Sequence, residues 1–274
     1  MAIITVSRQL ASLGDEISRN IAEHLGYKFF GRKEIERRIV ELGFPEAKLA
    51  KFDEKKLGFF TGLTRIRDEY LNYLMTAILE AASENNSVIV GRGSFIILNS
   101  LENHVSCRFI SDKKIRIERL QKELNCDFKN ASKKITESEN QQKGFYKSFF
   151  NFDVLDPGMY DLIVNTSVID TDSIVKSIIA LADSCITSEK DEKGRKKIEE
   201  MLIGQRIVNM LLFDYSLNIN FLRISIEGNK IILHGIAESD VAVDSAVTIV
   251  GAELPHYQIE SAIAITQDFK SYTR

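Results

Sequence analysis

The segment MAIITVSRQLASLGDEISRNIAEHLG, residues 1–26, decides how the rest of the chain can fold. The apolar run Ile3–Val6 predicts a buried strand, and the polar segment Ser7–Gly14 predicts a loop. We expect a helix from about Asp15, because apolar residues then recur at every fourth position until Gly26. A strand, a tight loop and a helix start, in this order, let backbone N–H groups and the helix dipole hold a phosphate.

The loop matches a phosphate-binding loop only in part. The motif G-x-x-x-x-G-K-[ST] needs a lysine and a hydroxyl after its last glycine. In this chain Gly14 is followed by Asp15 and Glu16, and Gln9 stands where the first glycine belongs. From these residues alone, an ordinary turn between a strand and a helix is an equally good interpretation.

Length and composition describe an ordinary globular protein. A chain of 274 residues predicts two domains of unequal size, and a net charge of −3 gives no nucleic-acid footprint, so no nucleic-acid partner is expected. No apolar run reaches membrane-spanning length and no leader segment is visible, so we expect a cytoplasmic protein. Cys107, Cys126 and Cys185 lack metal-binding spacing, and we expect buried thiols and no metal site.

Further apolar strands follow along the chain. Ser87–Val90, His104–Ile110 and Tyr160–Thr166 are continuous apolar runs, and helical patterns separate them. Such strands predict an α/β fold with a parallel sheet and helices on both faces. Ligands bind beyond the carboxyl ends of strands in such sheets, where Ser7–Gly14 and Gly91–Gly93 lie.

Shorter elements fill the space between the first two strands. Tyr27–Phe30 predicts a short extended piece, Arg32–Leu42 a helix and Glu46–Phe52 a further short helix. The charged and then Gly/Phe-rich segment Lys51–Gly62 predicts a mobile loop.

The segment Arg65–Ala82 predicts a long helix with an apolar stripe. Such a stripe serves either core packing or contact with a second chain. Because it is longer than one domain face usually needs, we predict a homodimer through this helix.

The charge run Ser188–Lys197 marks a change of pattern and is interpreted as a solvated linker or helix start. Beyond it come a helix, two alternating strands around Gly228-Asn229, another helix and a last strand. We therefore expect two domains, 1–187 and 195–274, that fold independently, the second a small α+β unit with an antiparallel sheet.

Five motifs occur in the first part of the chain in a characteristic order: Ile4–Ile17, Phe30–Glu34, Val88–Gly93, Arg116–Arg119 and Asp156–Ser167. In this order and spacing they resemble the cytidylate-kinase-like proteins of the nucleoside monophosphate kinase group. The resemblance implies a P-loop kinase fold with a donor site, an acceptor site and a basic lid. It also implies ATP and Mg²⁺ as cofactors and a nucleotide such as CMP as acceptor.

The resemblance assigns roles to three groups of residues. Those implied to hold the donor phosphates, together with the loop N–H groups, are Ser7, Arg8, Gln9, Ser12 and Gly14. Those implied to hold the acceptor are Arg32 and Arg92. Those implied to close over the transferring group in catalysis are Arg116, Arg119, Lys143 and Lys147. By their spacing alone, Arg116 and Arg119 are equally consistent with a solvated helix face.

The chain departs from the family pattern where anions would be held. Ala11 and Leu13 replace the family's usual glycines, and Asp15 replaces what is often a basic residue. Gly31 stands where the family has an acid, and Glu137–Gln142 lacks the lid's arginines and lysines. The alternative is therefore a pseudokinase that acts as a nucleotide sensor or scaffold, with phosphoryl transfer weak or absent.

The segment Arg195–Thr266 resembles a BON domain. The similarity rests on the hairpin and on Ile232–Ala237 and Val250–Leu254. It implies a binding module for a protein, a small ligand or a lipid surface, without catalytic residues.

Overall fold

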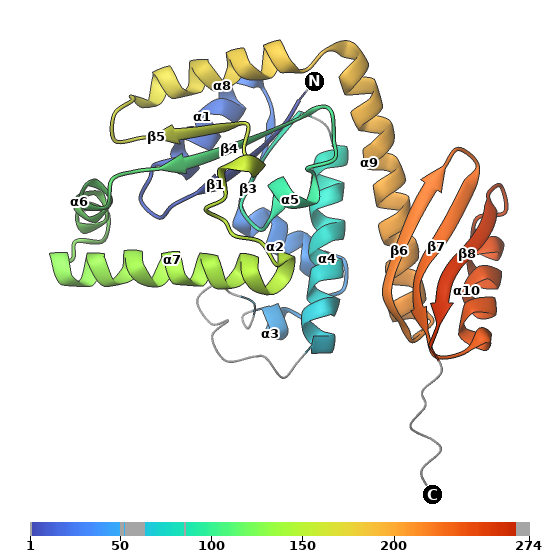
Figure 1. The fold of residues 1–274 in the computed structure, drawn as a ribbon. Coiled ribbons are helices and arrows are strands. Elements are labelled where there is room, and N and C mark those ends of the chain that lie inside the picture. The colour runs from blue at the N-terminus through green and yellow to red at the C-terminus, as the bar shows by residue number, and fades with distance from the viewer. Residues whose placement is uncertain (1, 50–51, 53–63, 85, 267–274) are drawn as a thin grey trace, which may run out of the picture. The chain divides into compact units, whose positions relative to one another are not determined.

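The computed structural model describes residues 2–49, 52, 64–84 and 86–266 (Figure 1). The chain forms two compact units, Met1–Arg195 and Lys196–Arg274, and the division falls within helix α9 (Ser188–Asn209). The charge run at this boundary is therefore helical and is not a linker. Opposite charges stand four residues apart along it, and the ion pairs Lys193–Glu189 (2.7 Å) and Arg195–Asp191 (2.9 Å) stabilise the helix.

A five-stranded sheet forms the centre of the first unit, in the order β2-β3-β1-β4-β5. Its strands are β1 (Ile3–Arg8), β2 (Lys28–Phe30), β3 (Ser87–Val90), β4 (His104–Ile110) and β5 (Leu162–Asn165). Every neighbouring pair is parallel, which confirms the predicted α/β class. Because β1 is the central strand, the loop that follows it lies in the middle of the sheet's carboxyl edge.

Helices cover both faces of this sheet (Figure 1). They are α1 (Gly14–Leu25), α2 (Arg32–Glu41), α3 (Glu46–Leu49), α4 (Thr64–Ser83), α5 (Ser94–Ile97), α6 (Lys113–Leu124), α7 (Phe128–Phe150) and α8 (Thr171–Cys185). The predicted loop Lys51–Gly62 lies outside the described residues except for Phe52.

The two faces of β1 and β4 differ in chemistry. On one face Ile4, Val6, Cys107 and Phe109 join the apolar core under α1 and α8. On the other face polar side chains are paired across the strands. Their contacts are Thr5 with His104 (2.6 Å), Ser7 with Arg108 (2.8 Å) and Ser106 with Asp161 (2.9 Å). A polar face inside a parallel sheet is unusual, because both faces are normally apolar.

The apolar stripe of α4 is covered by its own unit. Tyr70, Leu74 and Ile78 are fully buried, and Tyr70 stacks on Phe52 with ring centroids 4.4 Å apart. The Phe149 ring of α7 packs against both, with its centroid 5.5 Å from that of Tyr70 and 6.2 Å from that of Phe52. The stripe therefore serves core packing, and the homodimer prediction loses the observation on which it rested.

The second unit is a three-stranded sheet with helical partners. Its elements after α9 are a π-helical turn (Met210–Asp214), β6 (Ile219–Glu227), β7 (Lys230–Ala237), α10 (Asp240–Glu253) and β8 (Gln258–Ile265). The hairpin at Gly228, which has a φ of +61°, is present as predicted. The sheet is not purely antiparallel, however, because β8 pairs parallel to β7. The intervening helix α10 carries the chain back to the starting end, as a parallel crossover requires.

Two further expectations have clear outcomes. Of the three cysteines only Cys107 is buried, whereas Cys126 is half-buried and Cys185 is exposed, so the prediction of buried thiols was wrong for two of them. Within the described residues, no helix has the length and apolarity needed to cross a bilayer.

We expect His104 to make stability depend on pH. Burial lowers the pKa of His104 to about 4 from a usual value of 6.5, so the unfolded chain takes up a proton that the folded chain excludes. Stability is then complete above about pH 6.5 and falls as the pH drops towards 4, by up to about 3 kcal/mol. Denaturant titrations at several pH values should show a flatter profile for His104→Gln. The control His24→Gln, in an exposed position, should keep the wild-type slope, and an unchanged slope in His104→Gln would refute the assignment.

We also expect the two units to fold separately. The start of α9 belongs to the first unit, where Asn103 Nδ2 donates to Asp191 Oδ1 (3.3 Å). Fragments 1–195 and 188–274 share this segment, so each keeps its own contacts. Thermal unfolding followed by circular dichroism should show a cooperative transition for each. Two unfolded fragments would contradict the prediction.

Candidate functional site

The loop after β1 keeps a glycine-type backbone without glycines. Ala11 and Leu13 have φ values of +61° and +62°, in the left-handed region that normally favours glycine. Side chains hold this conformation: Ser12 Oγ donates to the Gln9 carbonyl (2.8 Å), and Gln9 Oε1 accepts from Ser111 N (3.0 Å). Gln9 and Ser12 therefore shape the loop, whatever ligand it holds.

Gly14 is required at the start of α1. A Cβ at this position would lie 2.5 Å from Arg8 Cβ, so only glycine lets the helix begin this close to β1. The N-cap residue Leu13 supplies no side-chain cap. The first N–H groups of α1 are thus left for another acceptor, as in an anion-binding helix start.

Arg8 is paired with the residue that replaces the motif's lysine. Its Nη2 lies 3.1 Å from Asp15 Oδ1, and its Nε donates to the same oxygen at 3.2 Å. The helix dipole also favours a carboxylate in this first turn. The cation predicted to hold donor phosphates is therefore neutralised by a carboxylate at the same loop.

The structure brings Arg32 and Arg92 together, as the acceptor assignment requires. Arg32 Nε donates to Glu36 Oε1 (2.7 Å), and Arg92 Nη2 binds the same oxygen. Arg92 is only 3% exposed, and its Nη1 also donates to the Phe52 carbonyl (3.3 Å). Phe150 covers Gly93 so closely that a Cβ there would clash with its ring. Sequence reasoning missed Glu36, although its position one helical turn after Arg32 was a usable signal.

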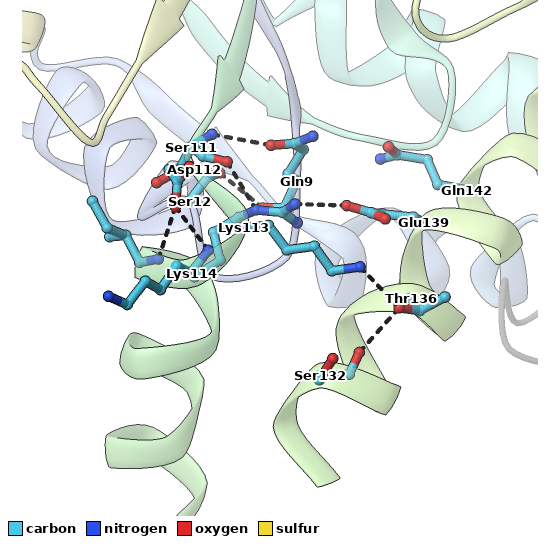
Figure 2. A network of polar contacts seen from close by, with 12 residues as sticks. Gln9, Ser12, Ser111, Asp112, Lys113, Lys114, Ser132, Thr136, Glu139 and Gln142 are labelled. Carbon is cyan, nitrogen blue, oxygen red and sulfur yellow. Dashed lines mark hydrogen bonds and ion pairs between the residues drawn. The ribbon is translucent and has the colours of Figure 1, made fainter. Parts of the chain in front are cut away.

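Arg116 and Arg119 are not solvated. Arg116 is 3% exposed, and its Nε donates to the Ser111 carbonyl (3.0 Å). Its Nη2 donates to Glu139 Oε1 (2.6 Å) on α7, part of the network in Figure 2, whereas its Nη1 is buried without a partner. Arg119 Nη1 instead donates to the Ala11 carbonyl (3.4 Å) and to Thr166 Oγ1 (3.1 Å). Arg119 therefore links the loop to the residue that follows β5.

Lys143 and Lys147 do not join these arginines. Both are exposed on α7, and Lys147 Nζ donates to Asn151 Oδ1 (2.7 Å) at the end of the same helix. The α7 side chains that do reach the site are Glu139 and Gln142, whose Nε2 donates to the Arg8 carbonyl (3.1 Å). In Figure 2 the side chains of Glu139 and Gln142 lie to the right of Gln9. The lid segment is thus a continuous helix that presents a carboxylate and an amide.

In the part of the chain that the structure describes, no group of three or more His, Cys, Asp or Glu side chains is arranged to hold a metal ion. Asp15 and Glu16 are the carboxylates in the first turn of α1. A Mg²⁺ ion there would need a ligand's phosphates and water to complete its shell.

A family model described as the cytidylate kinase-like family matches residues 3–168, more than half of the chain. The chain belongs to the cytidylate kinase-like family. The cytidylate kinase of Pyrococcus horikoshii is 28% identical over 201 residues, 73% of this chain and 96% of that protein. The cytidylate kinase of Thermococcus kodakarensis is 27% identical over 200 residues, 71% of this chain and 96% of that protein.

Among solved structures, an uncharacterized protein from Eubacterium ventriosum superposes with a TM-score of 0.53 at 21% identity. The alignment covers 67% of this chain and 99% of that protein, and it shows a shared fold. The chain is thus a nucleotide-kinase-like protein by family.

We expect Arg92→Ala to weaken binding of a nucleoside monophosphate more than Arg119→Ala. Arg92 is held among Glu36, Phe52 and two glycines at a strand end, whereas Arg119 donates to the Ala11 carbonyl of the loop and to Thr166 Oγ1 after β5. Loss of a charged hydrogen bond in a rigid site costs about 1.5–3 kcal/mol. Calorimetric titration of both variants with CMP measures the difference. Equal losses would show that the acceptor assignment of Arg92 is wrong.

Proposed function

We propose that the first unit binds nucleotide phosphates at the Ser7–Gly14 loop and transfers phosphoryl groups weakly or not at all. The observation that carries this proposal is the ion pair of Arg8 with Asp15 at the start of α1. Family membership and the loop's left-handed backbone support binding. Asp15 argues against efficient transfer.

Phosphoryl transfer depends on positioning and on neutralising the charge of the donor's phosphates. In this chain Asp15 brings a negative charge to the place where the motif has a lysine, and it occupies Arg8. Glu139 likewise forms an ion pair with Arg116 (2.6 Å). A donor would have to displace both carboxylates before either arginine could act on it.

An active nucleoside monophosphate kinase is the second candidate. The relatives named cytidylate kinase favour it, as does the Arg32–Glu36–Arg92 cluster, which suits an acceptor phosphate. In this version ATP is the donor and CMP or a similar nucleotide the acceptor. Mg²⁺ would bind the donor phosphates with Asp15 or Glu16 and offset their negative charge.

For the second unit we propose a BON-like binding module. Its support is the element order helix, two strands, helix, strand that the structure shows after residue 195. Phe221 is 84% exposed, with a φ of +53° where the pairing of β6 with β7 is irregular. An exposed aromatic in such backbone suits contact with a protein, a small ligand or a lipid surface. A homodimer and a cytoplasmic location stay predictions.

We expect Asp15→Lys, alone and with Glu16→Ser, to raise nucleotide affinity at least tenfold or to raise turnover, because it restores attraction and releases Arg8. Calorimetry with ATP and CMP, beside a coupled CMP kinase assay, measures both quantities. Asp172→Lys is a matched control, since Asp172 is the second residue of α8 as Asp15 is of α1. It should change neither quantity.

Ordinary kinase turnover by the unmodified chain would refute the weak-transfer proposal and favour the kinase with a Mg²⁺ bridge. Tight nucleotide binding without turnover would support the proposal. A wild-type chain that binds no nucleotide would refute both versions.

A further inference from the structure

Arg108 is a buried cation that no sequence motif assigned. It lies on β4, is 3% exposed, and its Nη1 donates to Ser7 Oγ (2.8 Å) and to Tyr160 Oη (3.2 Å). Its guanidinium also lies over the Tyr160 ring, 5.4 Å from the centroid. Both hydrogen-bond partners are neutral oxygens, and no carboxylate of the described residues forms an ion pair with it.

The other buried arginines of this unit show how unusual this is. Arg92 and Arg116 are equally buried, at 3% exposed, and each has a carboxylate, Glu36 and Glu139 respectively. A buried charge without a counter-charge is unfavourable, and proteins usually pair it. Arg108 therefore differs from Arg92 and Arg116 in having no carboxylate partner, so an anion can pair with it without displacing one.

The surrounding groups do not supply the missing charge. Burial raises the pKa of the Tyr160 phenol, which stays protonated near neutral pH. Asp161 is engaged by Ser106, whose N and Oγ donate to Asp161 Oδ2 at 2.7 and 2.9 Å. His104 is neutral, since burial lowers its pKa to about 4. The carboxylates of Asp161 and Asp153 lie near this face, but neither forms an ion pair with Arg108 among the described residues. The guanidinium beside Ser7 thus has only neutral hydrogen-bond partners.

The position of this charge points to the candidate site. Ser7 and Arg108 are register partners. Ser7 is one residue before the end of β1, and Arg108 is two residues before the end of β4. On the other side of β1, Gly91 N donates to the Val6 carbonyl (2.8 Å). A Cβ at Gly91 would lie 2.9 Å from Arg8 Nη1, so the glycine leaves room for the Arg8 guanidinium at this edge. Ligands bind at this edge in parallel sheets.

We propose that Arg108 binds a phosphoryl group of the ligand and that Ser7 and Tyr160 orient its guanidinium for this contact. The proposal rests on the proposed function for the source of the phosphate, a nucleoside monophosphate; free phosphate offers the same chemistry. A guanidinium is planar, keeps its charge when buried and can give two parallel hydrogen bonds to a phosphate. A phosphate dianion would give Arg108 the ion-pair partner that no described carboxylate provides.

The test uses the full chain and three probes: CMP, inorganic phosphate and cytidine, which lacks a phosphate. The first variant is Arg108→Met, which keeps a long side chain and removes its charge. The second is Arg108→Lys, which keeps the charge and removes the paired N–H donors of the guanidinium. Arg37→Met is the control, because Arg37 lies on α2 with 72% of its side chain exposed. Calorimetry gives affinities, and thermal unfolding in phosphate-free buffer gives stability.

We expect Arg108→Met to weaken CMP and phosphate binding at least tenfold, with Arg108→Lys in between and Arg37→Met unchanged. The response to cytidine should be the same in all chains. In phosphate-free buffer Arg108→Met should unfold at the wild-type temperature or above it, because a buried charge without an ion-pair partner has been removed. A lower unfolding temperature with unchanged CMP and phosphate affinity would show a structural role and overturn the proposal.

The outcomes separate this proposal from the proposed function. Equal CMP affinity in wild type and Arg108→Met overturns the role of Arg108 and leaves nucleotide binding intact. Phosphate binding that depends on Arg108, in a chain that ignores CMP, supports Arg108 and refutes the nucleotide. If Arg108→Met does not fold, Arg108→Lys decides, and wild-type phosphate affinity in that variant overturns the proposal. A wild-type chain that binds neither probe overturns both.

Discussion

The contact between Gly14 and Arg8 is the constraint on which the candidate site depends. Because Gly14 has no side chain, α1 begins directly against the end of β1, and the five residues between them form a tight loop. This packing forces Ala11 and Leu13 into left-handed backbone, which Ser12, Gln9, Ser111 and Arg119 hold by hydrogen bonds. The left-handed backbone of this loop is thus held by hydrogen bonds at positions that have no glycine.

Charge pairing inside the site decides what a ligand has to displace. Arg8, Arg32, Arg92 and Arg116 each have a carboxylate from the same unit, at Asp15, Glu36 or Glu139. These pairs satisfy the cations without a ligand, at the expense of their attraction for phosphate. Asp15 and Glu139 each hold an arginine that the family resemblance assigns to phosphate, so a bound phosphate would compete with these carboxylates.

The second unit follows a different constraint. Its strand β8 lies beside β7 in parallel because α10 returns the chain to the other end of the sheet, and the apolar face of α10 closes the core with Leu211, Ile231 and Leu233. The buried members of this core cluster are all apolar. The cytidylate kinases of Pyrococcus horikoshii and Thermococcus kodakarensis are each covered to 96%, whereas more than a quarter of this chain lies outside each alignment.

The order of elements, the α/β class and the hairpin at Gly228 follow from the sequence itself, because apolar periodicity and turn residues act locally. The sequence also singles out Arg32 and Arg92 as acceptor candidates, and the structure places both on Glu36 Oε1. Only the tertiary structure decides which charges meet. Glu36 has a local signal only for its pair with Arg32, four residues before it, and not for Arg92. Glu139 and Arg108 pair with residues 23 and 101 positions away, so no local pattern indicates their contacts. The direction of β8 and the burial of the α4 stripe are likewise settled by packing, because no local pattern records which surface will cover a given face.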